Sequence, residues 1–187
     1  ADKFKDTPLH GAAKSSDCDT FIAIMNHKNS DVNVKDFRNK TPLMYAIADG
    51  KYDIVQMIIT KYEDVVDFDD VDDRGQGLGF VAPFSGFLNT FILVCNCEKI
   101  DLNKPRNDGF YLIHIIVTSN QVDFARVFLE QERADPNVKL PDGSTPIHIA
   151  AKKGFTEIVK LFSDNVKTDV NARDRYEMTP LHLAIKH

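Results

Sequence analysis

The chain has 187 residues, 43% of them hydrophobic and 27% charged, a composition typical of a globular or repeat protein. Its net charge of −5 argues against sequence-independent binding to nucleic-acid phosphates, and no apolar run approaches the roughly 20 residues of a membrane-spanning helix. Three cysteines are too few and too irregularly placed for a disulfide framework, so we expect a reducing, intracellular compartment.

The first predicted helices follow a short opening motif that recurs along the chain. TPLH at residues 7–10 is followed 34 residues later by TPLM at 41–44, and TPIH at 145–148 is followed after the same interval by TPLH at 179–182. Threonine is a good helix N-cap and proline is favoured at the first helical position. Each motif therefore predicts the start of a helix.

Two degenerate copies occupy the middle of the chain, and their closing motifs locate them. IDLNKP at 100–105 and ADPNVK at 134–139 have the form of SDVNVKD at 30–36 and TDVNARD at 168–174. Counting back from these motifs gives all six openings, with the second copy longer than the others by two residues; the openings lie near 7, 41, 77, 111, 145 and 179.

Each copy predicts two helices and a protruding turn. In the fifth copy, Gly154 stands where a left-handed helix end is expected, and EIVKLF at 157–162 places apolar residues on one stripe of a second helix. One such unit cannot bury its apolar stripe alone, whereas a stack of units can.

This pattern resembles the ankyrin-repeat family, through DGSTPIHIAAKKG at 142–154, the DVN closings and the period near 33. The resemblance covers the whole chain, as five repeats and the start of a sixth. It implies an all-α ankyrin-repeat solenoid of stacked helix–turn–helix units with β-turn or hairpin fingers, forming one domain over residues 1–187. We also expect the chain to be part of a longer protein.

The third copy departs most from the pattern. Gly77, Gly79 and Pro83 occupy its first-helix slot, and a proline beyond the first helical turn costs about 3 kcal/mol. We expect this helix to be short, shifted or partly unwound. The fourth copy keeps His114 but lacks the Thr-Pro cap.

No catalytic or metal-binding motif is present in the sequence. GxSxG, HExxH, Walker-type and CxxC patterns are missing, and CNC at 95–97 has no second ligand pair with metal spacing. His10, His114, His148 and His182 share one repeat position, so we expect each to hydrogen-bond backbone near its turn and to hold adjacent repeats in register. The sequence thus predicts neither an enzyme nor a cofactor or metal site.

The family resemblance implies that a partner binds in a concave groove lined by the turn tips and the exposed face of each first helix. Exposed aromatic and arginine side chains are favoured at interface hot spots. The predicted partner-binding residues are Phe37, Arg38, Lys40, Asp73, Arg74, Gln76, Phe84, Asn107, Asp108, Phe110, Asp142, Lys152, Lys153, Arg175 and Tyr176. For Phe84 and Phe110, packing against the next turn is an equal alternative.

Two other segments compete as sites. The acidic segment, residues 63–73, is a solvated, lengthened turn, a site for an electropositive partner with Phe68 as anchor, or a weak calcium site, although no EF-hand spacing supports calcium. GFVAPFSGF at 79–87 is either an altered core or a break in the stack that bends the solenoid or opens a pocket for a peptide.

The function predicted is therefore non-catalytic binding of another protein or peptide by a chain that is monomeric in isolation. The sequence predicts neither nucleic-acid binding nor direct membrane insertion. A regulatory segment of a larger enzyme, channel or transporter, docking on its own chain, is the alternative. Because no cluster of lysine and arginine is present, the cytoplasm is expected over the nucleus.

Overall fold

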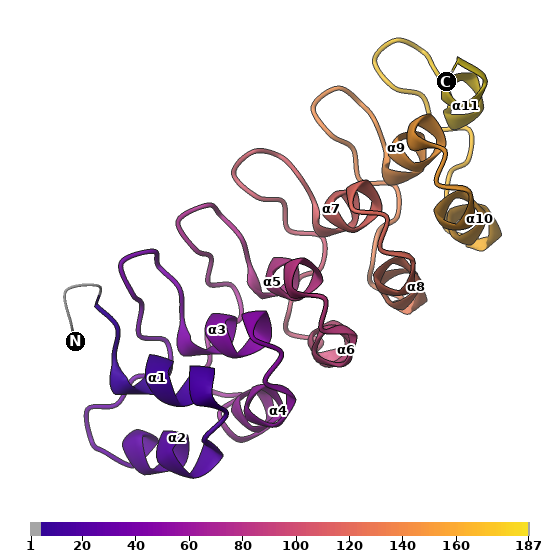
Figure 1. The fold of residues 1–187 in the computed structure, drawn as a ribbon. Helices are drawn as coiled ribbons and strands as arrows, with labels where there is room; N and C mark the ends of the chain where they lie inside the picture. The colour runs from indigo at the N-terminus through magenta and orange to yellow at the C-terminus, as the bar shows by residue number, and fades with distance from the viewer. Residues whose placement is uncertain (1–4, 187) are drawn as a thin grey trace. The chain divides into compact units, whose positions relative to one another are not determined.

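The structure is a computed structural model that describes residues 5–186, with only the backbone described at residues 84 and 85. The described residues form helices and no strand, which confirms the predicted all-α class (Figure 1). The helices are α1 (Pro8–Ser15), α2 (Cys18–Met25), α3 (Pro42–Ala48), α4 (Tyr52–Lys61), α5 (Leu78–Ser85), α6 (Leu88–Asn96), α7 (Leu112–Thr118), α8 (Val122–Glu130), α9 (Pro146–Lys153), α10 (Thr156–Asp164) and α11 (Pro180–Lys186).

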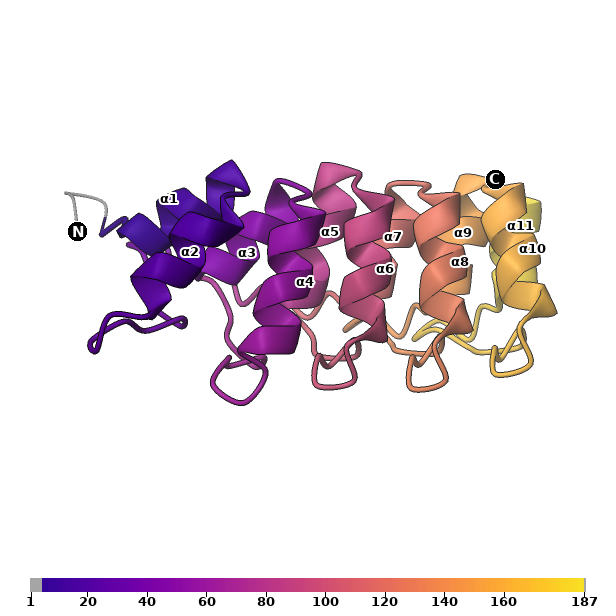
Figure 2. The same ribbon diagram turned by 90° about the horizontal axis from the view of Figure 1, so that it is seen from below.

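The helices group into two compact units, residues 1–101 and residues 102–187. In the N-terminal unit, α1, α3 and α5 pack in sequence, as do α2, α4 and α6. In the C-terminal unit, α7 packs on α9 and α9 on α11, while α8 packs on α10. Within each unit the first helices of the repeats therefore form one layer and the second helices another, which Figure 2 shows from the side of the second helices.

The first helices begin where the opening motifs predict. Pro8, Pro42, Pro146 and Pro180 are the first helical residues of their repeats. The hydroxyl of Thr41 accepts a hydrogen bond from the backbone N–H of Met44 over 3.3 Å, which caps α3. Gly154 ends α9 with φ at 69°, the left-handed conformation expected of it.

The apolar stripes of the second helices form much of the core. Phe21, Phe91, Phe128 and Phe162 occupy this layer, one in each of α2, α6, α8 and α10, and each has 0% exposure. Small residues of the first helices, such as Ala46 and Ala150, are also fully buried. Each stripe is thus covered by a neighbouring repeat, because a single repeat cannot bury its own apolar stripe.

The expectation of a shortened helix in the third copy is wrong. α5 spans Leu78–Ser85, as long as α1 and α9, and contains Pro83 inside the helix. Pro83 is the sixth of eight residues, so it removes only one hydrogen bond near the end of the helix. Gly86 then ends α5 with φ at 77°. The segment 79–87 therefore keeps the helical fold of its repeat, with Leu78–Ser85 in α5 and Gly86 at its end.

Candidate protein-binding surface

A five-residue finger precedes each of the first helices from the second copy onward. In every finger, the N–H of the first residue donates to the carbonyl of the fifth over 2.9–3.1 Å, and the N–H of the fourth donates back to the carbonyl of the first. The fingers are residues 36–40, 72–76, 106–110, 140–144 and 174–178. These hydrogen bonds satisfy the backbone of a tight turn that projects from the helices, in agreement with the predicted fingers.

The fourth residue of every finger has a positive φ. Gly75, Gly109 and Gly143 hold this position in the middle fingers, and Asn39 and Glu177 hold it in the outer two. Gly143 is required for two reasons, its positive φ and the lack of space for a side chain. An added Cβ would lie 2.9 Å from the backbone nitrogen of Arg175 in the next finger.

Three fingers begin with an aspartate that serves the turn itself. The carboxylate of Asp36 accepts the N–H groups of Arg38 and Lys40, each over 2.8 Å, and the hydroxyl of Tyr45 over 2.6 Å. Burial raises the pKa of Asp36, but these hydrogen bonds outweigh it and leave the pKa below its ordinary value. Asp72 and Asp174 accept the corresponding backbone N–H groups of their own fingers.

Adjacent fingers are joined by single backbone hydrogen bonds. The N–H of Asp73 donates to the carbonyl of Arg38 over 2.9 Å in the N-terminal unit. In the C-terminal unit, the N–H of Arg175 donates to the carbonyl of Asp142 over 3.0 Å. The tips are therefore fixed relative to each other within these pairs, and their outward side chains form a preorganised surface.

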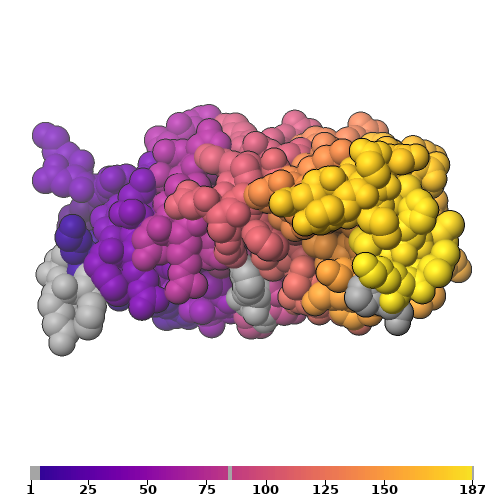
Figure 3. Space-filling model, turned by 90° about the horizontal axis from the view of Figure 1, so that it is seen from above, coloured from indigo at the N-terminus to yellow at the C-terminus, as the bar shows by residue number. Residues whose placement is uncertain are grey.

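We call the fingers and the last turns of the first helices of each unit the finger face. Figure 3 views the protein from the side toward which the fingers project, and the last finger, in yellow, lies at this surface. Of the predicted binding residues, those that are exposed are Phe37, Arg38, Asp73, Arg74, Asn107, Asp108, Lys152, Lys153, Arg175 and Tyr176. Those that are half-buried are Lys40, Gln76, Phe110 and Asp142. Phe84 lies in α5, and its side chain is outside the described part of the structure.

Two fingers carry an exposed aromatic ring beside an arginine. Phe37 is 52% exposed, with the Arg38 guanidinium 5.1 Å from its ring centre. Tyr176 is 72% exposed, with the Arg175 guanidinium 5.7 Å away. Phe110 differs, because its half-buried ring packs edge-on against His114 at a centroid distance of 6.3 Å. The aromatic–arginine pairs are the finger residues best suited to anchor a partner.

The finger face of the C-terminal unit contains a cleft of about 340 Å³, which we call the finger–helix cleft. It brings Asp142 of a finger together with Lys152 and Lys153 of α9, three of the predicted binding residues. Its lining consists of Leu140, Asp142, Ser144, His148, Ile149, Lys152, Lys153 and Leu183. The remaining predicted residues lie outside this cleft.

The recurring histidines have the expected structural role at two positions. Nε2 of His10 lies 3.0 Å from the carbonyl of Lys40, and Nε2 of His148 lies 3.0 Å from that of Met178, so each ring reaches the next finger. Nδ1 of each ring contacts the threonine that opens its own repeat. These rings therefore connect neighbouring repeats.

His114 departs from this arrangement. Its ring lies near the backbone of Ser144, but within the described residues Nε2 has no partner that meets hydrogen-bond geometry. Burial lowers the pKa of His114 to about 4, so the ring is neutral at physiological pH.

The acidic segment does not present Phe68 as an anchor. Phe68 is only 9% exposed, and Asp70 and Asp72 are buried as well. Asp70 forms an ion pair with Lys35 from the preceding repeat. The hypothesis of an exposed aromatic anchor is therefore wrong, because this ring belongs to the packed interior, while Glu63, Asp64, Asp67 and Asp69 remain exposed.

The asparagines of the closing motifs have a role that sequence reasoning missed. The side-chain amide of Asn33 donates to the carbonyl of Val65 over 2.7 Å, and its oxygen accepts the N–H of Asp67 over 2.8 Å. Asn103 and Asn137 make the same pair of bonds to the repeats that follow them. Their recurrence in every DVN-like motif was the available signal, and it marks contacts that stabilise the stack.

No group of three or more His, Cys, Asp or Glu side chains in the described part of the chain is placed to hold a metal ion. None of the described helices has the length and apolar character needed to cross a membrane. Cys95 is buried, and Cys18 and Cys97 are half-buried.

A family model described as ankyrin repeats (3 copies) matches residues 1–69 and 113–187. The chain belongs to the ankyrin-repeat family. The stretch between the two matched segments contains the degenerate third repeat, whose first helix carries Pro83. Ankyrin repeats are generally protein–protein interaction modules, and the ankyrin-repeat fold is typically non-catalytic.

A curated relative is the probable 26S proteasome regulatory subunit p28 of Saccharomyces cerevisiae, 34% identical over 74 residues. The match covers 40% of this chain and 32% of p28, so the ankyrin-repeat chain spans about a third of the relative it matches.

Two solved structures show the same fold. The ankyrin repeat domain of Bcl-3, a member of the IkappaB family, has a TM-score of 0.88 and 17% identity, covering 97% of this chain and 78% of that one. A chain in the complex of the predatory endopeptidase Bd0816 from Bdellovibrio bacteriovorus with immunity protein Bd3460 has a TM-score of 0.75 and 19% identity, covering 97% and 92%.

Proposed function

We propose that this ankyrin-repeat chain is a non-catalytic binding module that holds another protein on its finger face, the concave face of the stack. The observation that carries the proposal is the set of exposed side chains on a preorganised backbone. The pairs Phe37–Arg38 and Tyr176–Arg175 are exposed on fingers whose backbones are internally hydrogen-bonded. A surface of this kind binds through many modest contacts and a few dominant anchors, and it needs no reactive residue.

The finger–helix cleft supports the same proposal. It combines half-buried aliphatic side chains with the exposed cations Lys152 and Lys153. Small binding sites in proteins commonly combine an apolar lining with a few polar groups that fix orientation. The alternative, a regulatory segment that docks on its own larger chain, would use the same surface and stays a prediction.

Affinity capture with two matched variants tests the proposal. The finger variant carries Arg38→Glu and Tyr176→Ala, one change in each aromatic–arginine pair. The control variant carries Arg126→Glu on α8 and Tyr52→Ala on α4, exposed positions of the second helices. Circular dichroism first establishes that both variants fold like the unmodified chain.

A protein captured by the unmodified chain and by the control, but lost with the finger variant, supports binding on the finger face. Proteins captured equally by all three forms would contradict it and direct attention to the exposed acidic segment. Proteins lost only with the control variant would place the working surface on the second helices.

A further inference from the structure

The finger–helix cleft has an apolar floor. Leu140 at the base of a finger, Ile149 of α9 and Leu183 of α11 are half-buried, and all three line the cleft. Half-buried aliphatic side chains leave apolar area that a partner's side chain can cover, at about 25 cal/mol for each Å² removed from water. The floor thus favours a ligand that brings at least one aliphatic or aromatic group.

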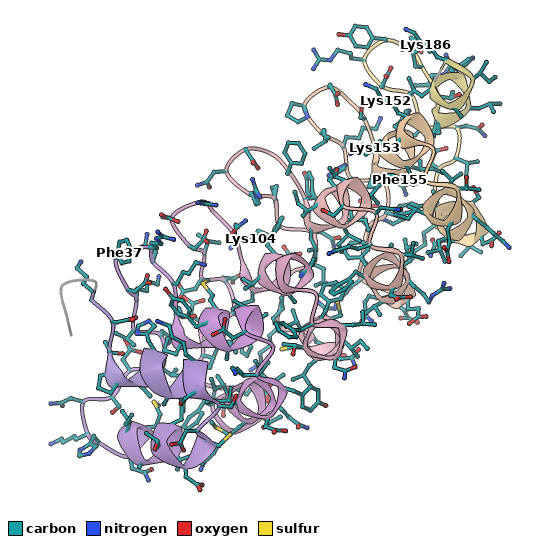
Figure 4. The ribbon with its side chains drawn as sticks, viewed as in Figure 1. Phe37, Lys104, Lys152, Lys153, Phe155 and Lys186 are labelled. Atoms are coloured by element: carbon teal, nitrogen blue, oxygen red, sulfur yellow. The ribbon has the colours of Figure 1, made fainter. Side chains whose placement is uncertain are left out.

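The rim of the cleft is basic. Lys152 and Lys153 line it, and Lys186 stands on the adjoining helix α11 (Figure 4). Among the residues that the structure describes, Lys152 and Lys186 have no hydrogen-bond or ion-pair partner. Lys153 donates to the carbonyl of Thr118 over 3.3 Å, which leaves its charge uncompensated. All three lysines are exposed.

Asp142, the one carboxylate among the described residues that line the cleft, is already engaged. Asp142 accepts the N–H of Ser144 over 2.9 Å. Burial raises its pKa, but hydrogen bonds from Ser144 and the charge of Arg175 outweigh this and hold the pKa below its ordinary value. Asp142 is thus turned toward its own finger and its neighbour, and the lysine charges dominate the open side of the cleft.

The two unpaired lysines have a defined spacing. Lys152 and Lys186 occupy the same repeat position, seven residues after the opening threonine, on helices that pack against each other. Packed helix axes lie about 8–10 Å apart, so the two ammonium groups can reach carboxylates separated by a similar distance. Two or three residues of extended chain, at roughly 3.3 Å each, cover about 7–10 Å.

We propose that the finger–helix cleft binds an extended acidic segment of a partner protein, with two carboxylates two or three residues apart and an apolar residue between or beside them. Lys152 and Lys186 pair with the carboxylates, and the apolar residue lies on Leu140, Ile149 and Leu183. This inference rests on the proposed function and names the chemistry of the partner at one part of the finger face.

Selection from a random peptide library displayed on phage tests the proposal, with the full chain as bait. Enriched peptides are then made with a fluorescent label, and their affinity is measured by anisotropy at low and high salt. The test variant is Lys152→Glu with Lys186→Glu. The control variant is Arg126→Glu with Lys160→Glu, which makes the same change in net charge on α8 and α10.

The expected peptides carry two acidic residues within three positions of each other, next to an apolar residue. Their affinity falls at least about tenfold in the test variant, stays within about twofold in the control, and weakens as salt screens the charges. Substituting Leu183→Ala, which keeps every charge, weakens binding by a smaller factor.

Several outcomes would overturn the proposal. Enriched peptides without acidic residues, peptides that bind the test variant equally well, or no enrichment at all each contradict it. If non-acidic peptides are lost with the finger variant described above, the proposed function survives and only this inference fails. Peptides insensitive to every finger-face change would overturn both. Self-association of the chain that the test variant abolishes would show that the cleft instead takes the exposed acidic segment of a second copy.

Discussion

The two units of this ankyrin-repeat protein share one backbone design and differ in what their charges do. Residues 1–101 contain 11 Lys and Arg against 17 Asp and Glu, whereas residues 102–187 contain 12 against 11. The acidic excess of the whole chain therefore belongs to the N-terminal unit. Several of these acids are structural, since Asp36, Asp70 and Asp72 are buried. In the C-terminal unit, by contrast, Lys152 and Lys186 stand exposed and unpaired on the finger face.

The difference teaches that net charge is a poor guide to a repeat protein's binding chemistry. A charge of −5 for the chain suggests a cationic partner. In the structure, Asp36 and Asp72 serve finger turns and Asp70 forms an ion pair between repeats, so these three acids are not available to a partner. The charge left over on the C-terminal finger face is positive, and it predicts an acidic partner there.

The largest expected effect comes from removing a buried finger aspartate. Asp36→Ala deprives two backbone N–H groups and the Tyr45 hydroxyl of their acceptor in a site that is 3% exposed, which we expect to cost about 3 kcal/mol of unfolding free energy. Asp174→Ala removes the acceptor of the corresponding two backbone N–H groups in a half-buried finger of the C-terminal unit. We expect this change to cost about 1 kcal/mol of unfolding free energy. Urea unfolding followed by circular dichroism measures both. Equal losses of unfolding free energy in the two variants would contradict the distinction between the buried finger of the N-terminal unit and the half-buried finger of the C-terminal unit.

An intermediate effect concerns pH and the buried His114. Its folded pKa of about 4 lies below the ordinary value of 6.5, so the folded state binds fewer protons than the unfolded state between these values. The contribution of neutral His114 to the free energy of unfolding is complete above about pH 6.5. It decreases as the pH falls toward 4, and about 2 kcal/mol of it is lost at pH 5.

His114→Met isolates this contribution, because the second repeat carries Met44 at the same repeat position. Urea unfolding of both forms at pH 8 and pH 5 should show a smaller loss in the variant, by about the same 2 kcal/mol. If the variant loses as much stability as the unmodified chain, His114 is not the titrating group. The carboxylates with lowered pKa values, such as Asp36 and Asp142, act mainly below pH 4 and do not obscure this window.

The smallest expected effects compare one ion pair from each unit. Lys35→Ala leaves the buried carboxylate of Asp70 without its cation, and we expect a loss of about 1 kcal/mol. Arg173→Ala breaks a 3.0 Å pair with Glu177 whose side chains are 61% and 76% exposed, and such pairs contribute about 0.5 kcal/mol or less. Thermal unfolding in low and high salt distinguishes the two pairs. High salt should reduce the effect of Arg173→Ala, because it screens an exposed pair, and should change the effect of Lys35→Ala less. A larger loss for Arg173→Ala would reverse the comparison.

Much of the fold could be predicted from the sequence because its signals are local and repeated. These signals act within one repeat. They are the Thr-Pro caps at residues 7, 41, 145 and 179, the left-handed turn at Gly154 and the apolar stripe of each second helix. Their recurrence fixed the family and the all-α class. The exposed state of finger residues such as Arg38 and Tyr176 followed from the same register.

Only the tertiary structure decided what depends on the neighbouring repeat. Packing between repeats decides whether Pro83 breaks α5, whether Phe68 is exposed and which acids are buried. Local propensity does not encode this packing. The asparagine bonds of Asn33 and the link between Asp142 and Arg175 likewise join residues more than 30 positions apart. The finger–helix cleft belongs to this class too, since one finger and two helices must meet before Leu140, Lys152 and Leu183 share a surface.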